Sequence, residues 1–214
     1  MNAQAGLAPI CLFTYNRLSH TRQVIQALEA NTLAQKSDLY IFSDGPKLEK
    51  DRAPIEVLRE YLDEVSGFKS VTVFKQDVNL GLANNIINGV SRVLEEYTNV
   101  IVLEDDLVTS SKFLTYMNDA LNKYKKNNNV ASIHAYSYPL KRPMLEEYFI
   151  VGSDCWGWAT WRDQWQTFET DGKVLMSRLM LSGRMKQFNL DDCADYSAML
   201  EAQIKGENNS WAVR

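Results

Sequence analysis

The sequence carries three adjacent carboxylates, Glu104, Asp105 and Asp106, directly after the apolar run at residues 100–103. Like charges at the end of a buried strand repel one another unless a cation or hydrogen-bond donors compensate them. Mg²⁺ or Mn²⁺ needs only one or two protein carboxylates, because water and substrate phosphate oxygens complete its coordination shell. We therefore predict a divalent-metal site at these three residues, which we call the acidic triplet. The alternative is a solvated acidic turn before a helix.

Polar residues also end two other apolar runs: Thr14, Asn16 and Arg17 end the first, and Asp44 follows the second. An arginine in this place can bind a phosphate or a carboxylate, although a surface arginine that opens a helix is the commoner case. Asp44 precedes Gly and Pro, as in an ordinary turn. Asn84 lies in a segment rich in Asn and Gly whose backbone N–H groups could bind a phosphate or a sugar hydroxyl, or which could simply cap a helix.

A dense group of tryptophans at residues 156–161 is a second candidate for ligand binding. Indole rings offer flat apolar faces that suit sugar C–H surfaces or a nucleobase, while core packing is the more frequent role for at least half of them. Gly157 stands between two of these tryptophans, which suggests that its backbone approaches a ligand such as a sugar ring. Asp154 is a polar candidate beside this group.

Three aspartates, Asp191, Asp192 and Asp195, precede or open the last amphipathic segment. Carboxylates at a helix N-terminus are stabilised by the helix dipole, which explains them without any function. One of them could instead act as a general base.

The elements that must position these residues follow from the hydrophobic pattern. Short apolar runs read as buried strands, and apolar residues at three- and four-residue spacing read as helices. Strands that alternate with helices predict an α/β fold with a doubly wound, mainly parallel sheet, whose ligands bind at the carboxyl ends of the strands. We expect strands over residues 9–15, 39–42, 71–74, 100–103 and 130–135, and helices over 83–97, 113–124 (with Ser110 or Ser111 as its N-cap) and 196–204.

The pattern becomes less regular after residue 138. We therefore expect an α/β half over residues 1–138, followed by a small irregular lobe of the same domain over residues 139–214. Because the chain stops at Arg214 without a polar tail, we expect that lobe to be truncated.

Composition limits the classes of function. The 214 residues are 45% hydrophobic and carry 23 Lys and Arg against 27 Asp and Glu, a net charge of −4, which argues against a nucleic-acid partner. No apolar run reaches the roughly 20 residues of a membrane span, and no signal peptide is visible. Three widely separated cysteines indicate neither disulfides nor a zinc cluster. We predict a cytoplasmic protein, with the inner membrane face as an alternative peripheral location.

Residues 9–17, 42–45 and 102–107 together resemble the nucleotide-sugar-binding half of GT-A glycosyltransferases. The Glu-Asp-Asp form of the acidic motif is similar to that of the N-acetylglucosaminyltransferase type, and bacterial sugar transferases are closer in length. The resemblance extends over about the first 165 residues, and the order of its motifs is more specific than any one of them.

The resemblance also implies roles for individual residues. Asn16 and Arg17 would lie beside the nucleotide, and Asp44 would bind its uracil or ribose. Asp106 would coordinate Mn²⁺ or Mg²⁺ on the diphosphate. The remaining implied positions are Glu104 and Asp105 at the ribose and donor sugar, Gly157 and Trp158 near the acceptor, and a general base among Asp191, Asp192 and Asp195, with Asp191 ranked first.

The implied reaction is metal-dependent transfer of a sugar, with inversion, from a nucleotide-diphosphate donor such as a UDP-sugar to a glycan or other hydroxyl acceptor. Synthesis of bacterial surface polysaccharide is the expected setting. Two other classes stay open: a metal-dependent nucleotidyl or phosphoryl transferase on the same type of sheet, and a non-catalytic carbohydrate-binding module that uses the tryptophans.

Overall fold

A six-stranded sheet organises the first two-thirds of the chain in the computed structural model, which describes residues 6–139, 141, 145 and 147–213. The strand order is β3-β2-β1-β4-β6-β5. The strands are β1 (Ile10–Thr14), β2 (Asp38–Ser43), β3 (Ser70–Lys75), β4 (Asn99–Glu104), β5 (Ser132–His134) and β6 (Trp158–Trp161).

Three parallel pairings make this sheet that of an α/β fold. Strands β3, β2, β1 and β4 are parallel, so a helix must return the chain between successive strands. Only β6 runs against its neighbours β4 and β5. The predicted doubly wound, mainly parallel sheet is confirmed.

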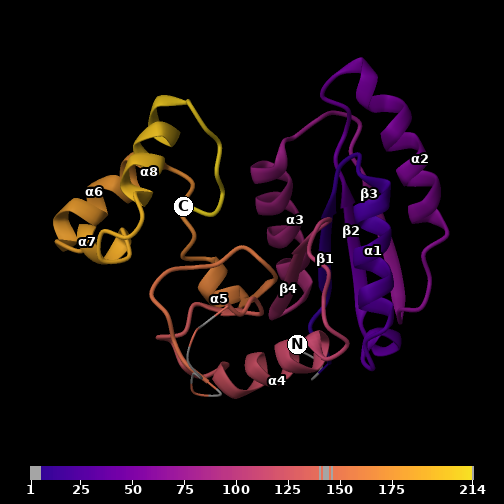
Figure 1. The fold of residues 1–214 in the computed structure, drawn as a ribbon, viewed down its shortest axis with the longest axis horizontal. Coiled ribbons are helices and arrows are strands. Elements are labelled where there is room, and N and C mark those ends of the chain that lie inside the picture. The colour runs from indigo at the N-terminus through magenta and orange to yellow at the C-terminus, as the bar shows by residue number, and fades with distance from the viewer. Residues whose placement is uncertain (1–5, 140, 142–144, 146, 214) are drawn as a thin grey trace. The chain divides into compact units, whose positions relative to one another are not determined.

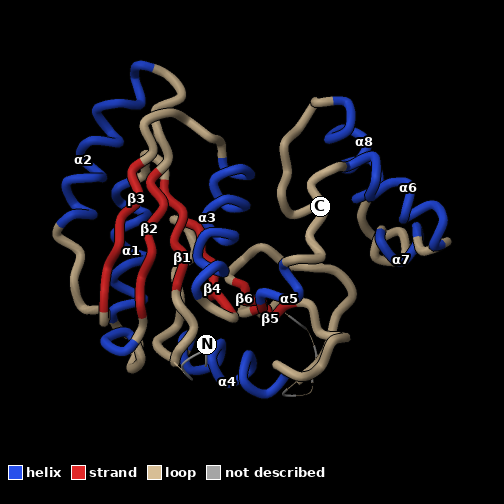
Figure 2. The backbone as a smooth tube through the Cα atoms, turned by 180° about the vertical axis from the view of Figure 1, so that it is seen from behind, coloured by secondary structure: helices blue, strands red, loops and turns tan. Residues whose placement is uncertain are grey.

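Helices cover both faces of this sheet, with α1 (Leu18–Glu29) and α2 (Arg52–Asp63) on one face and α3 (Leu82–Glu96) on the other (Figures 1 and 2). The face toward α1 is built from alternate strand residues such as Ile10 and Leu12, which join the main buried cluster. On the other face, Phe13 stacks on Phe42 with ring centroids 5.0 Å apart. The sheet is therefore buried on both sides, as its continuous apolar strands predicted. Short 3₁₀ turns, η1 (Ala34–Lys36) and η2 (Glu49–Asp51), and the helices α4 (Phe113–Tyr124) and α5 (Arg162–Trp165) complete this part.

Three details differ from the sequence-based expectations. Strand β3 is only half-buried, because it forms the edge of the sheet. The tryptophan segment contributes the buried strand β6 instead of an irregular lobe. The N-cap of α4 is Lys112, whose side chain makes no capping hydrogen bond. The N–H of Leu114 in the first turn is instead accepted by the side chain of the buried Asn31 at 3.0 Å. The capping hydrogen bond expected from Ser110 or Ser111 is therefore made by a residue distant in the chain.

The chain divides into two compact units, residues 1–135 with 156–166, and residues 136–155 with 167–213 of the described chain. The second unit contains α6 (Gly172–Ser182), α7 (Met185–Phe188) and α8 (Tyr196–Lys205), as Figure 1 shows in orange and yellow. Its small core is formed by Met176, Leu200 and Val213. Helix α8 lies where a helix over residues 196–204 was expected, and Gly206 caps its C-terminus in the left-handed conformation. Within the described part of the chain, no helix is both long enough and apolar enough to cross a membrane.

Candidate active site

The carboxyl ends of β1, β2 and β4 meet at one edge of the sheet, which we call the carboxyl edge. Register fixes this arrangement: Thr14 at the end of β1 pairs with Ser43 of β2, and Phe13 pairs with Glu104 of β4. Because parallel strands end together, the residues that follow them are brought to the same place. The candidates Asn16, Arg17, Asp44 and the acidic triplet all follow these strands at the carboxyl edge.

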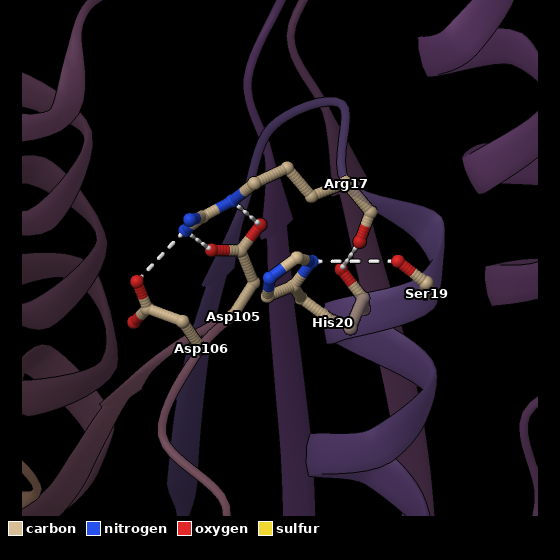
Figure 3. A network of polar contacts seen from close by, with 6 residues as sticks. Arg17, Ser19, His20, Asp105 and Asp106 are labelled. Carbon is tan, nitrogen blue, oxygen red and sulfur yellow. Dashed lines mark hydrogen bonds and ion pairs between the residues drawn. The ribbon is translucent and has the colours of Figure 1, made fainter.

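Arg17 binds two carboxylates of the acidic triplet (Figure 3). Its guanidinium pairs closely with Asp105 and donates from Nη2 to Oδ2 of Asp106 at 3.1 Å. Asp105 is buried, whereas the Asp106 side chain keeps 44% of its surface exposed. The arginine thus compensates the buried charge of Asp105, which would be costly without a partner. The carboxylate of Asp106 stays accessible to a ligand.

Glu104 shows that this compensation is incomplete. Burial, followed by the nearby charges of Asp106 and Asp105, raises the pKa of Glu104 to about 7 against the opposing effect of Arg17. Three carboxylates therefore share one guanidinium, and additional positive charge would be stabilising here.

The donor set suits a hard divalent ion that is only partly held by protein. No group of three His, Cys, Asp or Glu side chains among the described residues converges closely enough to form a complete metal cage. Mg²⁺ and Mn²⁺ do not need such a cage when one or two carboxylates are supplemented by water and phosphate oxygens. The accessible carboxylate of Asp106, beside an undercompensated Glu104, fits that mode of binding.

Asp44 is buried and already accepts four hydrogen bonds. Its Oδ1 accepts the N–H groups of Gly45 and Leu80, and its Oδ2 accepts from Gly81 N–H and from the amide of Asn79. A carboxylate offers about four acceptor positions, so a nucleotide contact from this side chain would have to displace a protein donor. Asp44 therefore stabilises the loop before α3 through hydrogen bonds within the protein.

The same contacts explain the Asn- and Gly-containing segment. The backbone N–H groups of Leu80 and Gly81 bind Asp44, so an internal carboxylate already fills the position at the start of α3 that was considered for a phosphate. Gly45 is required here by a close approach, since a Cβ at this residue would lie 2.4 Å from the carbonyl carbon of Val78. Asn84 is exposed and donates to the carbonyl of Leu80.

Two further predicted residues end β1 with different environments. Asn16 makes a long contact of 3.4 Å from Nδ2 to Oδ1 of Asp51. Thr14 is 4% exposed, and its hydroxyl has no hydrogen-bond partner among the residues that the structure describes. This hydroxyl is both buried and unpaired, which makes it an unsatisfied polar group at the end of β1.

Sequence reasoning missed the residues that hold the carboxyl edge together. Arg59 of α2 donates from Nη2 to the carbonyls of Gln76 at 2.7 Å, Ser43 at 3.2 Å and Asp44 at 3.2 Å, and from Nε to the hydroxyl of Ser43. A signal was present, because Arg59 follows Ile55 by four residues and so lies on the buried face of the helix. An arginine within an apolar stripe indicates a specific partner.

A hydrogen bond between Tyr15 and Asp51 also stabilises the carboxyl edge. The hydroxyl of Tyr15 donates to Oδ2 of Asp51 at 2.8 Å and accepts the N–H of Lys47 at 3.0 Å. The loop after β1 is thereby fastened to the loop after β2. The hydrogen bond from Tyr15 lowers the pKa of Asp51, which keeps it ionised at neutral pH.

The candidate tryptophans divide between surface and core: Trp156 is 49% exposed, whereas Trp158 and Trp161 are buried. Trp158 is buried in β6 and stacks on Trp165 at 5.7 Å, so its indole belongs to the core and does not present a face to a ligand. Gly157 has φ +75°, and the side chains that a Cβ would meet lie 3.5 Å or more away. The glycine is therefore needed for its backbone conformation, not for a close approach. Asp154 belongs to the second unit, where it accepts a hydrogen bond from Tyr138.

The candidate bases lie in an unusual turn of the second unit. Leu190, Asp191 and Asp192 have φ of +50°, +55° and +68°, a left-handed region that aspartate adopts more readily than leucine does. Asp195 caps α8 by accepting from the N–H of Ala198, and Asp192 lies 4.0 Å from Lys186. Asp191 is exposed and its carboxylate has no ion pair or hydrogen bond within the described part of the chain. Strained backbone is concentrated at functional sites, which favours this turn as one.

Cavities alone do not identify the site. A cavity of about 920 Å³ lies at the amino ends of the strands, bordered by residues such as Leu7, Thr98 and Trp161, and none of the predicted site residues lines it. A second cavity of about 420 Å³ lies against Asp192, Cys193 and Asp195 in the second unit. The chemistry-bearing groups converge instead at the carboxyl edge, which is where open α/β sheets bind their ligands.

Comparison with known families matches the model of Glycosyl transferase family 2 over residues 10–196. That match includes the carboxyl edge of the sheet and the left-handed turn, and it covers most of the chain. The chain therefore belongs to glycosyl transferase family 2. No curated protein matches it.

One solved structure supports the fold, and a second is similar to a lesser extent. The mannosyltransferase PcManGT from Pyrobaculum calidifontis, in complex with GDP-Man and Mn²⁺, aligns with a TM-score of 0.50 and 11% identity over 83% of this chain and 55% of that one. The chain thus spans about half the length of that enzyme. The 4-diphosphocytidyl-2C-methyl-D-erythritolsynthase from Anaerococcus prevotii DSM 20548 aligns with a TM-score of 0.40 and 9% identity over 88% and 85% of the two chains.

Proposed function

We propose that this chain transfers a sugar from a UDP-sugar to a hydroxyl acceptor, with a divalent metal ion at Asp106 and with inversion at the anomeric carbon. The observation that carries the proposal is the acidic triplet with Arg17 at the carboxyl edge of a family 2 sheet. The undercompensated charge around Glu104 and the accessible carboxylate of Asp106 both support a cationic ligand there.

On the donor side, each residue has a physical task. Asp106 would hold the ion, and Mn²⁺ or Mg²⁺ when bound supplies positive charge that stabilises the departing diphosphate. Arg17 is rigidly positioned by Asp105 and can present its guanidinium to the same phosphates. Thr14 ends β1 at the same edge, and its unsatisfied hydroxyl would reach the nucleotide only if the edge opened on binding.

On the acceptor side, Asp191 would take the proton of the attacking hydroxyl. Its carboxylate is exposed, whereas Asp195 is engaged as the cap of α8. A positioned base of this type contributes roughly 10²- to 10⁴-fold to the rate. We expect Asp191→Asn to lower kcat by that amount and to leave the affinity for UDP unchanged, while the control Asp195→Asn keeps its helix cap and its activity.

Isothermal titration calorimetry with UDP and Mn²⁺ tests the donor site. We expect binding by the wild-type chain, loss of binding in EDTA, and loss in Asp106→Ala. Asp119→Ala, an exposed aspartate of α4, is the matched control and should bind as the wild type does. Equal affinity of wild type and Asp106→Ala would contradict the proposal.

Two outcomes of these experiments would change the proposed function. Binding of GDP in preference to UDP would keep the metal site and change the donor. Turnover of nucleoside triphosphates without transfer of a sugar would replace the proposal with a nucleotidyl transferase.

A further inference from the structure

The left-handed turn at residues 190–192 lies in the connection between two helices of the second unit. Helix α7 ends at Phe188 and α8 begins at Tyr196 (Figure 1). All three residues of the turn have φ between +50° and +68°. Because a side chain makes this region costly, a run of three such residues persists only where surrounding interactions impose it. Those interactions decide how firmly Asp191 is held.

The end of α7 explains the first of these residues. Asn189 is the C-cap of α7. The N–H of Leu190 donates to the carbonyl of Gln187 at 3.1 Å, and the N–H of Asp191 donates to the carbonyl of Lys186 at 2.9 Å. These two bonds form a Schellman motif, which places the residue after the C-cap in the left-handed conformation. Leu190 is that residue, so the next two left-handed residues need a further cause.

Burial does not supply that cause. Asp191 and Asp192 are exposed, and so is Cys193, which follows them. A cavity of about 420 Å³ also lies along this connection, bordered by residues 189 and 192–195. The conformation of the turn therefore depends on hydrogen bonds that cross the connection.

Asn189 makes three hydrogen bonds of this kind. Its Oδ1 accepts the N–H of Ser197 at 2.9 Å, and its Nδ2 donates to the hydroxyl of Ser197 at 2.9 Å. Its backbone carbonyl accepts the N–H of Ala194 at 3.0 Å. An amide side chain suits this place because it donates and accepts at the same time. Asn189 thus joins the residue before the turn to residues on its far side.

The partners of Asn189 are themselves held by the start of α8. The hydroxyl of Ser197 donates to Oδ1 of Asp195 at 3.2 Å, and the same oxygen accepts the N–H of Ala198 as the cap of α8. Next to this network, the rings of Phe188 and Tyr196 meet edge to face with centroids 6.1 Å apart. The start of α8 is therefore a fixed point to which Asn189 fastens the turn.

We propose that Asn189 is a positioning residue, which holds the left-handed turn closed and thereby fixes the carboxylate of Asp191 without touching the reacting atoms. This inference rests on the proposed function, in which Asp191 is the base. A displacement of a catalytic group by about 1 Å lowers the rate about 100-fold. Loss of the bonds from Asn189 should therefore lower kcat and leave the affinity for the donor unchanged.

NMR spectroscopy measures the turn without any turnover. Three-bond couplings and intraresidue NOEs between the amide and Hα protons report the sign of φ at residues 190–192. We expect the left-handed signature at Asp191 and Asp192 in the wild-type chain and its loss in Asn189→Ala. Asn208→Ala is the matched control, since this asparagine of the same unit donates to the carbonyl of Met199 and lies outside the turn. A left-handed signature that persists in folded Asn189→Ala would overturn the proposal.

A double-mutant cycle tests whether Asn189 acts through Asp191. Release of UDP from UDP-glucose or UDP-N-acetylglucosamine measures kcat and KM. Asn189→Ala should lower kcat about 10- to 100-fold at an unchanged KM. In the Asp191→Asn background the same substitution should have no further effect, because the group that it positions is already gone. Equal losses of kcat in both backgrounds would overturn the proposal, and so would a change confined to KM.

Thermal unfolding shows whether each variant folds. If Asn189→Ala does not, Ser197→Ala retains the test, because it removes one of the two side-chain bonds and should lower kcat about 3-fold.

The two proposals fail in different ways. If Asp191→Asn keeps the wild-type kcat, Asp191 is not the base and Asn189 has no positioning role in catalysis. If the wild-type chain does not bind UDP and Mn²⁺, the donor site fails, while the NMR experiment still decides whether Asn189 holds the turn.

Discussion

The two edges of the sheet treat their carboxylates in opposite ways. At the amino ends of the strands, Asp38 accepts hydrogen bonds from Lys69 at 2.8 Å, Ser70 at 2.7 Å and Tyr97 at 3.3 Å. Burial opposes ionisation there, yet these donors hold the pKa of Asp38 below its usual value. At the carboxyl edge, burial and neighbouring carboxylates raise the pKa of Glu104 to about 7.

The two edges differ in how far the protein itself compensates the charge of the carboxylates. Around Asp38 one carboxylate has three donors, so the charge is satisfied by the fold itself. Around the acidic triplet, one guanidinium pairs with Asp105 and Asp106 while the pKa of Glu104 stays raised, and this uncompensated charge is what makes the triplet a candidate for a cationic ligand. The cavity of about 920 Å³ lies at the amino edge, and none of the candidate residues lines it. The size of a cavity therefore does not identify the candidate active site.

Replacing the basic side chain at each edge, Arg17 or Lys69, should give the largest difference in activity. We expect Arg17→Ala to lower kcat/KM for the donor at least 100-fold, which corresponds to about 2.7 kcal/mol, because the donor phosphates would lose this guanidinium and the triplet the arginine that pairs with it. Lys69→Ala at the amino edge is the control and should keep wild-type activity. Release of UDP from the donor measures both, and equal losses would remove the distinction between the edges.

The frame of the carboxyl edge should be the next most sensitive. Arg59→Ala should lower the free energy of unfolding by about 2 kcal/mol, since three backbone carbonyls and the Ser43 hydroxyl lose a charged donor. Arg59→Lys should recover only part of this, because an ammonium cannot reproduce the planar fork. Urea denaturation measures the change. Arg52→Ala, whose exposed guanidinium pairs with Glu49, should stay within about 0.5 kcal/mol, and a similar cost for both arginines would contradict the prediction.

At the amino edge, Asp38→Asn should cost about 1.5 kcal/mol at pH 7. The pKa of Asp38 is lower in the folded protein than its ordinary value of 3.8, so its ionised form stabilises the fold above that pH. This contribution disappears as the pH falls through the folded-state pKa. The gap between wild type and variant should therefore narrow at pH 3 in denaturation experiments. A constant gap would show that charge is not its source, and Asp63→Asn, in an exposed pair with Lys75, serves as the control.

The smallest expected effect has the opposite sign. Glu104→Gln should raise the free energy of unfolding by about 1 kcal/mol in EDTA at pH 8, because it removes a partly buried charge next to Asp105 and Asp106. Glu96→Gln, at an exposed end of α3, should change little. A loss of stability in Glu104→Gln would mean that the triplet is already neutralised by the fold.

The sequence predicted the main elements because their signals are local. The apolar runs gave four parallel strands, and the spacing of residues such as Ile86, Val90 and Val93 gave α3. It did not predict that β6 joins the sheet, because a strand that pairs antiparallel with β4 after a long connection depends on contacts far apart in the chain. Nor did it predict that Asn31 satisfies the start of α4 from another part of the fold.

By itself, the sequence determined which residues would stand at the carboxyl ends of the strands, since an apolar run followed by Glu104, Asp105 and Asp106 leaves little choice of position. Only the tertiary structure decided what each carboxylate meets there. Asp44 is consumed by the loop before α3, whereas Asp106 is left half-exposed beside Arg17. The physical reason is that hydrogen-bond partners come from elements distant in the chain, so whether a charge is compensated is a property of packing and not of local pattern.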